Sequence, residues 1–502
     1  MKILPIDKVR EADEYTIKNE PIASIDLMER AASRCYKWIR KRSRKNQIFR
    51  IVVGPGNNGG DGLVLARLLA ADKFRVEVII LRFTDKESGD FSINLERLKE
   101  QGKATLTELQ ENDELPVFRK KDILVDGIFG SGLTRPVKGF IASVIEAMNE
   151  SGALTIAIDM PSGLFADKNT TGTESRIVKA DYTLSFQFPK KAFFFPENDQ
   201  YTGEWEVLPI GLHKDFIQEV ECNDYFVLKK DAMEILHHRK KFSHKGTYGH
   251  ALLVSGAYGK MGAAVLAARA AMRSGAGLVT SHLPGKGYLI MQTANPEVMT
   301  SIDRSGEIFS EVPDLGPYTA IGVGPGLGTS EQTSNALKLL IQNSGIPMLF
   351  DADAINIISE NKTWIPFIPK GSIFTPHPKE FERLTTKADD DFHRNSLQKE
   401  FSIKYSCYVV LKGAHTIIST PKGKCFFNST GNPGMASGGS GDVLTGIILG
   451  LLAQGYTQLE ACMLGVYIHG LAGDYAAKKL GFESLIAGDI IDKLPKAFKK
   501  IS

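Results

Sequence analysis

The chain has 502 residues, too many for a single hydrophobic core, so we expect about two to four domains. Apolar residues make up 43% of the chain and charged residues 24%, as in ordinary soluble globular proteins. The net charge of +3 is small for this length. It gives no electrostatic argument for binding nucleic acid or an acidic membrane.

The cysteines favour a reducing compartment. They are odd in number, far apart and free of any CxxC spacing: Cys35, Cys222, Cys407, Cys425 and Cys462. This pattern argues against a zinc site or a disulfide framework. The first residues contain too short an apolar run for a signal peptide, and no later stretch approaches about 20 apolar residues. We therefore predict a cytoplasmic protein that binds neither nucleic acid nor membrane.

Strands and helices alternate through the N-terminal half. Residues 7–42 have the pattern of a packing helix with a basic end. Short apolar runs typical of strands occur at 49–54, 75–83, 122–130 and 154–163. Helices are predicted at 92–102 and 137–150. Such units form a parallel sheet with helices on both faces, and ligands bind beyond the carboxyl ends of its strands.

Polar motifs follow three of these strands: GPGNNGGDG (54–62), DGIFGSGLTR (126–135) and DMPSG (159–163). The first satisfies GxGxxG before a helix that we expect to begin near Gly62. Its pattern has two interpretations, a set of oxygens that hold a cation or polar ring, or a structural turn capped by Asp61. Because unpaired buried charge is unfavourable, three clusters converging on one sheet edge indicate a bound cation.

Together these three motifs resemble the YjeF N-terminal domain, the NAD(P)H-hydrate epimerase family, over roughly residues 5–215. The resemblance implies a Rossmann-like three-layer sandwich that binds the hydrated cofactors NADHX or NADPHX. It implies substrate contacts at Asn57, Asn58, Gly59, Gly60, Asp61, Gly130, Ser131, Gly132, Leu133, Thr134, Arg135 and Pro136.

The same resemblance implies the chemistry of this domain. A potassium ion would be held through Asn58, Asp126 and Ser162, and Asp159 would be the acid/base group that opens and recloses the hydrated ring. Eukaryotic relatives read FGFSFKG where this chain reads FGSGLTR. The lysine is therefore missing and Arg135 is nearby, so the second catalytic group stays open.

After a charged segment at 213–224, interpreted as the linker, the alternation restarts from Val227. Residues 244–280 predict a strand, a glycine turn, a tightly packed Ala-rich helix and another strand. Further strands end in the motifs GPGLG (324–328), DADAIN (351–356), TPHPKEF (375–381) and LKGAHT (411–416). No GxxxxGK[ST] motif occurs, which argues against a P-loop fold.

The segment NPGMASGGSGDVLTGIILG (432–450) carries the strongest chemical signal. Its glycines let the backbone approach a ligand, and the helix expected after Asp442 would present N–H groups to a phosphate. Asp442 is either the N-cap, which its pattern alone favours, or a base beside the transferred phosphate. His377, between two prolines, is likewise either structural, the commoner role of a lone histidine, or part of a site.

These ordered motifs resemble the YjeF C-terminal domain, the ADP/ATP-dependent NAD(P)H-hydrate dehydratase family of ribokinase-like fold, over about residues 225–500. The resemblance implies that Asp442 is the base that acts on the hydrate hydroxyl. It implies nucleotide contacts at Lys412, Gly413, Ala414, His415 and Thr416, an anion hole at Gly439, Ser440 and Gly441, and hydrate contacts at Ala263, Gly326 and His377. Bacterial fused forms generally use ADP, so we predict ADP, with Mg²⁺ neutralising its diphosphate. Asp351 and Asp353 are equally well explained as structural residues.

The sequence thus predicts an α/β protein with two doubly wound domains, residues 1–215 and 225–502. The predicted function is nicotinamide nucleotide repair, in which R and S hydrates are epimerised and the S form is dehydrated at the expense of ADP, giving AMP and phosphate. We also expect a homo-oligomer. The alternatives are a ribokinase-like small-molecule kinase with an accessory nucleotide-binding domain, which shares the phosphoryl step, and a non-catalytic dinucleotide sensor.

Overall fold

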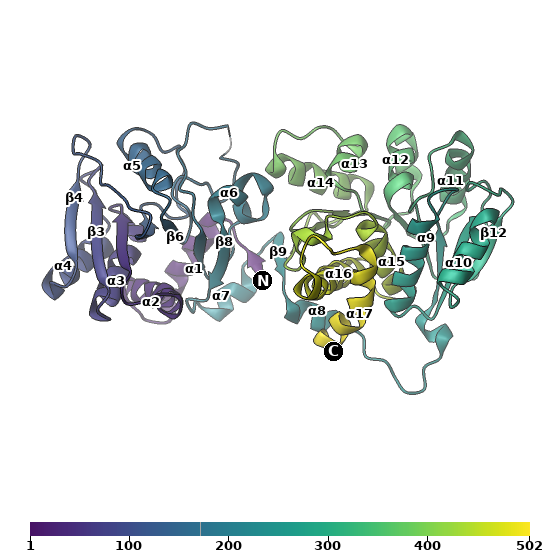
Figure 1. Cartoon of the computed structure of the whole chain (residues 1–502), viewed down its shortest axis with the longest axis horizontal. Helices are drawn as coiled ribbons and strands as arrows, with labels where there is room; N and C mark the ends of the chain where they lie inside the picture. The colour runs from purple at the N-terminus through teal and green to yellow at the C-terminus, as the bar shows by residue number, and fades with distance from the viewer. Residues whose placement is uncertain (171) are drawn as a thin grey trace. The chain divides into compact units, whose positions relative to one another are not determined.

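The computed structural model describes residues 1–170 and 172–502, which divide into two compact units (Figure 1). The N-terminal unit comprises Lys2–Cys222 with Asp390–Phe392. The C-terminal unit comprises Met1, Asn223–Asp389 and His393–Ser502. Among the described residues, every helix is too short or too polar to cross a membrane.

A seven-stranded parallel sheet forms the centre of the N-terminal unit, in the order β4-β3-β2-β5-β6-β7-β8. Its strands are β2 (Ile48–Val53), β3 (Arg75–Leu81), β4 (Thr105–Leu109), β5 (Ile123–Gly127), β6 (Leu154–Ile158), β7 (Tyr182–Phe186) and β8 (Glu204–Leu208), and a short β1 (Lys2–Ile3) precedes them. The central strands are apolar and buried on both faces, as parallel strands between helix layers must be. The predicted doubly wound sheet is confirmed.

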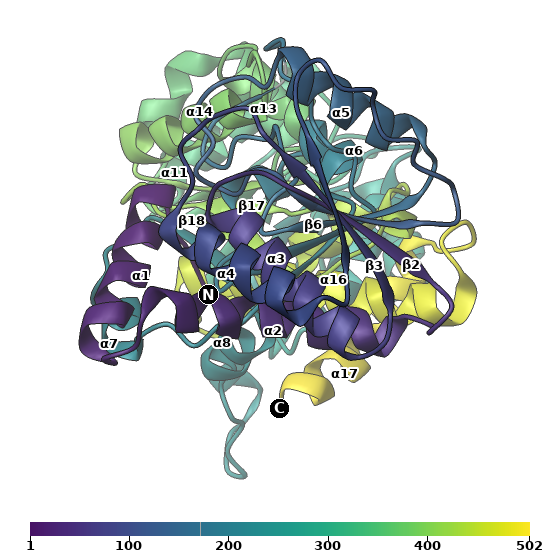
Figure 2. The ribbon, with the colours of Figure 1, turned by 90° about the vertical axis from the view of Figure 1, so that its left-hand side faces the viewer.

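Helices cover both faces of this sheet (Figures 1 and 2). The helices of the unit are α1 (Ile6–Asn19), α2 (Ser24–Arg42), α3 (Asn57–Ala71), α4 (Gly89–Gln101), α5 (Gly139–Glu150), α6 (Asp199–Thr202) and α7 (Lys214–Glu219). Helices α2, α3 and α4 pack side by side around a core that includes Trp38, Phe49 and Phe91. On the other face, Val144 and Ile145 of α5 pack against the sheet. These are the three layers expected from the sequence.

Two expectations about local structure in this unit are wrong. The single helix expected over residues 7–42 is broken near Pro21, whose ring and missing N–H stop a helix. Helix α3 begins at Asn57 instead of near Gly62, and its N-cap is Gly56, so Asp61 does not cap it. Gly59 allows this early start, since a Cβ there would lie 1.8 Å from the carbonyl oxygen of Gly54.

The C-terminal unit contains a mixed sheet in the order β9-β18-β17-β16-β15-β14-β13-β10-β11-β12. Its strands are β9 (Asp224–Val227), β10 (His250–Val254), β11 (Leu278–Pro284), β12 (Met299–Asp303), β13 (Ala320–Val323), β14 (Met348–Phe350), β15 (Ile373–Phe374), β16 (Tyr408–Leu411), β17 (Ile417–Ser419) and β18 (Cys425–Asn428). The pairs β16–β17 and β17–β18 are antiparallel, and the remaining pairs in this order are parallel.

Two helix layers enclose this sheet. Its helices are α8 (Lys229–Ile235), α9 (Met261–Arg273), α10 (Tyr288–Ala294), α11 (Glu331–Asn343), α12 (Ala352–Glu360), α13 (Pro378–Leu384), α14 (Asp391–Tyr405), α15 (Ser440–Ala453), α16 (Gln458–Leu480) and α17 (Ala487–Ile501). Helices α9, α15, α16 and α17 share one core and α11 to α14 the other. A Cβ at Gly446 would lie 2.1 Å from the carbonyl oxygen of Ala267, so α15 lies directly against the backbone of α9. The predicted close packing of the Ala-rich helix is confirmed.

The start of α15 differs from the expectation. The helix begins at Ser440, and its N-cap is Gly439 in the left-handed conformation, with φ of +89° and no side-chain cap. Asp442 therefore lies inside the first helical turn and does not end the loop. The capping interpretation of Asp442, which the sequence pattern alone favoured, is wrong.

Candidate active sites

A cavity of about 600 Å³ lies at the carboxyl ends of β2, β5 and β6 in the N-terminal unit. The predicted residues that line it are Asn57, Asn58, Asp61, Gly130, Ser131, Gly132, Leu133, Thr134, Arg135 and Asp159. Three other predicted residues, Gly59, Gly60 and Pro136, are not among the described residues that line it. Gly59 and Gly60 instead pack α3 against its surroundings, and a Cβ at Gly60 would lie 2.6 Å from the Met28 sulfur.

Asp159 is held at the end of β6 in a strained backbone conformation. Its φ is +62°, in the left-handed region that residues other than glycine seldom adopt. One carboxylate oxygen accepts hydrogen bonds from the Lys190 ammonium (2.7 Å) and the Phe186 N–H (3.3 Å). The other accepts from the Ser131 N–H at 3.2 Å. The carboxylate is therefore fixed at the cavity wall.

Lys190 is the partner that sequence reasoning missed. Its side chain is only 1% exposed, and the ammonium also donates to the Ser185 hydroxyl at 3.0 Å. Burial alone would raise the pKa of Asp159, but Lys190 and the N–H donors lower it below its ordinary value. The signal was present, because QFPKK follows the strand-like TLSF at the same edge of the sheet.

Two further carboxyl groups line the same cavity, Asp61 of α3 and Asp13 of α1. Burial and the neighbouring Asp159 raise the pKa of Asp13 to about 7 and that of Asp61 well above its usual range. Asp61 Oδ1 is buried without a hydrogen-bond partner in the described part of the chain. No sequence motif singles out Asp13, which lies in an amphipathic helix among other charged residues.

The residues predicted to hold potassium form one buried group. Asp126 accepts hydrogen bonds from the hydroxyl (2.6 Å) and the N–H (2.7 Å) of Ser162 and from the N–H of Ile128 (3.2 Å). Burial raises the pKa of Asp126 to about 6, and no basic side chain pairs with it within residues 1–170 and 172–502. The Asn58 side chain lies against Gly130, since a Cβ there would be 3.5 Å from Asn58 Oδ1.

In the C-terminal unit, Lys412 and Asp351 form a buried charged pair. The Lys412 ammonium donates to Asp351 Oδ1 at 2.9 Å, and the hydroxyls of Thr375 (2.8 Å) and Thr445 (2.7 Å) donate to the same carboxylate. A Cβ at Gly441 would lie 3.4 Å from the Lys412 nitrogen, so this ammonium lies directly beneath the glycine loop. The predicted nucleotide residue and the predicted anion hole are therefore neighbours.

Asp442 lies beside this pair without a hydrogen bond to Lys412. Burial and the charge of Asp351 raise the pKa of Asp442 to about 7, although Lys412 opposes the shift. A group that titrates near neutral pH is suited to accept a proton from an alcohol.

The other predicted residues of this unit lie in three places: a turn after Lys412, a neighbouring pair of residues, and the start of α13. Gly413 and Thr416 close a tight turn, in which the Gly413 N–H donates to the Thr416 hydroxyl at 3.3 Å, with Ala414 and His415 between them. A Cβ at Gly326 would lie 3.1 Å from that of Ala263, so these two predicted hydrate contacts adjoin. His377 has a structural role as the N-cap of α13, where its Nδ1 accepts from the Glu380 N–H at 3.2 Å.

The sequence also missed His469 of α16. Its Nε2 lies 3.3 Å from the Ser440 hydroxyl, next to the glycine loop. Burial lowers the pKa of His469 to about 4, so the ring is neutral at pH 7. Neutral imidazole both donates and accepts, which suits a residue that orients a hydroxyl.

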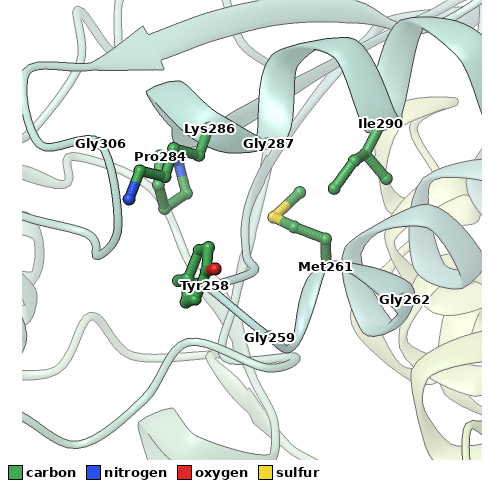
Figure 3. A pocket seen from close by; sticks show the side chains of 9 residues that line it. All are labelled: Tyr258, Gly259, Met261, Gly262, Pro284, Lys286, Gly287, Ile290 and Gly306. Atoms are coloured by element: carbon green, nitrogen blue, oxygen red, sulfur yellow. The ribbon is translucent and has the colours of Figure 1, made fainter.

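A smaller cavity of about 310 Å³ opens at the N-terminus of α9 (Figure 3). Met261 and Ile290 lie on one side of it, and Tyr258 and Lys286 on the other. Gly262 also lines this cavity, next in sequence to the predicted hydrate contact Ala263. In the described residues, no group of three His, Cys, Asp or Glu side chains is arranged to hold a metal ion.

Two doubly wound units, each with an aspartate and a lysine at the carboxyl ends of its strands, define an α/β enzyme with two active sites. Comparison with known proteins identifies its family. The sequence pattern for the YjeF-related protein N-terminus matches residues 24–192, and that for NAD(P)H-hydrate dehydratase matches residues 251–496. The bifunctional NAD(P)H-hydrate repair enzyme Nnr of Moorella thermoacetica is 35% identical over 100% of this chain and 97% of its own length. The chain belongs to this family of bifunctional NAD(P)H-hydrate repair enzymes.

Solved structures match the C-terminal unit. A ribokinase-like superfamily protein from Enterococcus faecalis is 28% identical, with a TM-score of 0.50 over 56% of this chain and 98% of that protein. The ADP/ATP-dependent NAD(P)H-hydrate dehydratase from Bacillus subtilis, co-crystallised with ATP and Mg²⁺, is 31% identical, with a TM-score of 0.49 over 55% of this chain and 99% of that one. The predicted ribokinase-like fold class is confirmed.

Proposed function

We propose that the two units divide the two reactions of the repair enzyme, with the epimerase in residues 1–215 and the dehydratase in residues 225–502. The first interconverts the R and S forms of hydrated NADH or NADPH. The second dehydrates the S form at the expense of ADP, giving AMP and phosphate. The observation that carries this proposal is Asp442, with its raised pKa, beside Lys412 under the glycine loop.

In the N-terminal unit, Asp159 is the base. The Lys190 ammonium keeps this carboxylate ionised at neutral pH, and its place on the cavity wall exposes it to a substrate. It accepts the hydroxyl proton of the hydrated ring, which lets the ring open to an aldehyde. Asn57, the loop at Gly130–Arg135 and Arg10 surround the rest of the cavity and hold the dinucleotide there.

A potassium ion fits the group formed by Asn58, Asp126 and Ser162. Asp126 is a buried carboxylate that no basic side chain neutralises in the described part of the protein, and a monovalent cation beside it would offset that charge. Amide, hydroxyl and carboxylate oxygens are the ligands that hard cations take. When bound, the ion supplies positive charge next to the substrate loop at Gly130. Epimerisation should slow in buffer whose only cation is tetramethylammonium and recover on adding KCl. An equal rate in both would remove the ion from the proposal.

In the C-terminal unit, Asp442 takes the proton of the hydrate hydroxyl. The hydroxyl oxygen attacks the terminal phosphorus of ADP, and AMP leaves. Lys412 and the N–H groups of Gly439–Gly441 stabilise the charge that develops on the phosphoryl group. Phosphorylation turns a poor leaving group into a good one. The lone pair of the ring nitrogen then expels phosphate to give an iminium ion, and loss of a proton from the adjacent ring carbon to solvent restores the dihydronicotinamide. Magnesium bound with the nucleotide supplies charge neutralisation of its diphosphate.

One experiment separates this function from the alternatives. The full chain is incubated with each hydrate epimer and ADP or ATP, while phosphate and reduced cofactor are followed together. Repair releases both in equal amounts, and without nucleotide only the epimers interconvert. A stable phosphorylated product would instead establish a small-molecule kinase, and binding without turnover would establish a dinucleotide sensor. A higher kcat/KM with ATP would contradict the choice of ADP.

Two further parts of the proposal concern the setting of the enzyme. All five cysteines are buried, which suits a reducing cytoplasm. We expect a homo-oligomer because α10 and the edge strand β12 expose apolar side chains, among them Leu289 at 73% and Ile302 at 53%. Light scattering on the purified chain measures the oligomeric state, and a monomer at micromolar concentration would contradict this expectation.

A further inference from the structure

The N-terminal cavity contains more carboxyl groups than its base requires. Asp13, Asp61 and Asp159 line it, together with the cation Arg10, and Lys190 lies behind Asp159. The lysine bonds Asp159 alone among the three, at 2.7 Å. Arg10 is directed to the carbonyl oxygen of Gly132, 3.5 Å away. Two carboxyl groups therefore face the cavity without a cation bonded to them.

Of these two, Asp13 is free to act on a ligand. It makes no hydrogen bond or ion pair within the described residues, and its side chain is only partly buried. The charges that act on it are Asp159 and Lys190 across the cavity and Glu14 on its own helix. Asp61 and Asp159 are equally buried, each at 8% exposed, but burial and the charges of neighbouring carboxylates raise the pKa of Asp61 well above its usual range. A carboxyl group that keeps its proton serves poorly in a cycle that gives and regains one.

We propose that Asp13 is the second acid/base residue of the epimerase, the proton donor to the ring nitrogen opposite the base Asp159. This inference rests on the function proposed above for the N-terminal unit. The guanidinium of Arg135, which also lines the cavity, carries hydrogen-bond donors and no acceptor, so it suits substrate binding instead of proton exchange.

The proton transfers balance. In the opening step Asp159 takes the hydroxyl proton, and the bond between the hydroxyl-bearing carbon and the ring nitrogen breaks. Its electron pair goes to the nitrogen, which Asp13 protonates, and the carbon becomes an aldehyde. Closure on the opposite face reverses each transfer: the nitrogen attacks the aldehyde and returns its proton to Asp13, and the oxygen regains a proton from Asp159. No oxidant, reductant or co-reactant is required.

The two carboxyl groups have the properties that these roles demand. The Lys190 ammonium holds Asp159 ionised, whereas burial and the Asp159 charge raise the pKa of Asp13 to about 7. A pair of carboxyl groups whose environments separate their pKa values is the usual arrangement for an acid and a base in one site. The acid form of Asp13 is present below pH 7 and is lost as the pH rises through that value.

The test measures interconversion of the R and S hydrates by the full chain without nucleotide, so that the dehydratase is idle. Asp13→Asn is expected to lower kcat about 10²- to 10⁴-fold. The matched control Glu14→Gln changes the exposed neighbour on the same helix and should keep the wild-type rate. Dehydration of the S hydrate with ADP is measured on the same preparations and should be unchanged in both variants. The wild-type rate should fall above about pH 7, and this limb should vanish from the residual rate of Asp13→Asn.

Two more variants keep the assignment falsifiable. Asp13→Ala should regain rate when formate or acetate is added, which a purely structural aspartate would not show. Asp61→Asn alters a predicted substrate contact but should keep the fall in rate above about pH 7, and loss of that limb in this variant alone would overturn the inference in favour of Asp61. If the wild-type chain interconverts the hydrates and Asp13→Asn does so at the same rate, the inference is overturned and the proposed function stands. A wild-type chain that interconverts no hydrate removes the proposed function and the inference with it.

Discussion

Asp159 and Asp442 stand at comparable places in the two units, each at the carboxyl edge of a sheet and beside one lysine, yet their environments differ. In the N-terminal unit the lysine bonds the proposed base itself, Lys190 to Asp159 at 2.7 Å. In the C-terminal unit Lys412 bonds a different carboxylate, Asp351, at 2.9 Å. The pKa of Asp159 is lowered as a result, whereas burial and Asp351 raise that of Asp442 to about 7.

The comparison shows how the bonding of a lysine sets the state of a nearby aspartate. Burial pushes the pKa of both carboxyl groups up, and only a cation in direct contact reverses that shift. The proposed base Asp159 is therefore ionised at neutral pH and can accept a proton, because Lys190 lowers its pKa. Asp442 gains basicity instead, because its higher pKa gives a stronger driving force for taking the proton of an alcohol.

The largest expected effect comes from removing each base in turn. Asp159→Asn should reduce epimerisation about 10²- to 10⁴-fold and leave dehydration of the S hydrate intact. Asp442→Asn should reduce dehydration by a similar factor and leave epimerisation intact. Both rates are measured on each full-length variant, with phosphate release for one reaction and epimer ratio for the other. If either variant lost both activities while remaining folded, the division of labour between the units would be wrong.

A second test removes the lysine that bonds the proposed base of the N-terminal unit. Lys190→Met leaves the Asp159 charge buried without a partner, which is expected to lower the free energy of unfolding of this unit by about 3–5 kcal/mol. The pKa of Asp159 should rise, so epimerisation should also gain an acidic limb. Denaturant unfolding followed by Trp38 and Trp205 fluorescence, and the pH dependence of the rate, measure both effects. The control Lys179→Met alters an exposed lysine of the same unit and should change neither.

The sequence predicted the architecture of both units well because the central strands are apolar and the glycine motifs mark the strand ends. It predicted most of the cavity lining for the same reason. The sequence did not predict Asn57 and Ser440 as the first residues of α3 and α15. These helix starts depend on how closely glycines approach a neighbouring backbone. The sequence did not predict Lys190 because its partner Asp159 lies 31 residues away. It did not predict Asp13 because only the fold brings this residue of α1 to the cavity.

A third test sharpens the comparison in the C-terminal unit. Asp351→Asn removes the charge that raises the pKa of Asp442 and leaves Lys412 free to interact with it. The acidic limb of the dehydration rate, expected near pH 7 in the wild type, should move down by about one pH unit, so that the rate at pH 6 rises from about a tenth to about half of the plateau. Thr445→Val is the matched control, because it removes a 2.7 Å hydrogen bond to Asp351 but keeps the charge. A limb that moved equally in both variants would assign the shift to lost structure instead of lost charge.

The smallest effect concerns the neutral histidine behind the glycine loop. The Ser440 hydroxyl and His469 Nε2 are 3.3 Å apart, and such a bond is worth about 1 kcal/mol, or about fivefold in affinity. Ser440→Ala and His469→Gln should each raise the KM for nucleotide by about that factor and leave epimerisation unchanged. Because both substitutions remove the same bond, the double variant should be little worse than either single one. Full additivity would mean that the two side chains act separately, and Lys412 would then be the principal side chain that positions the phosphate.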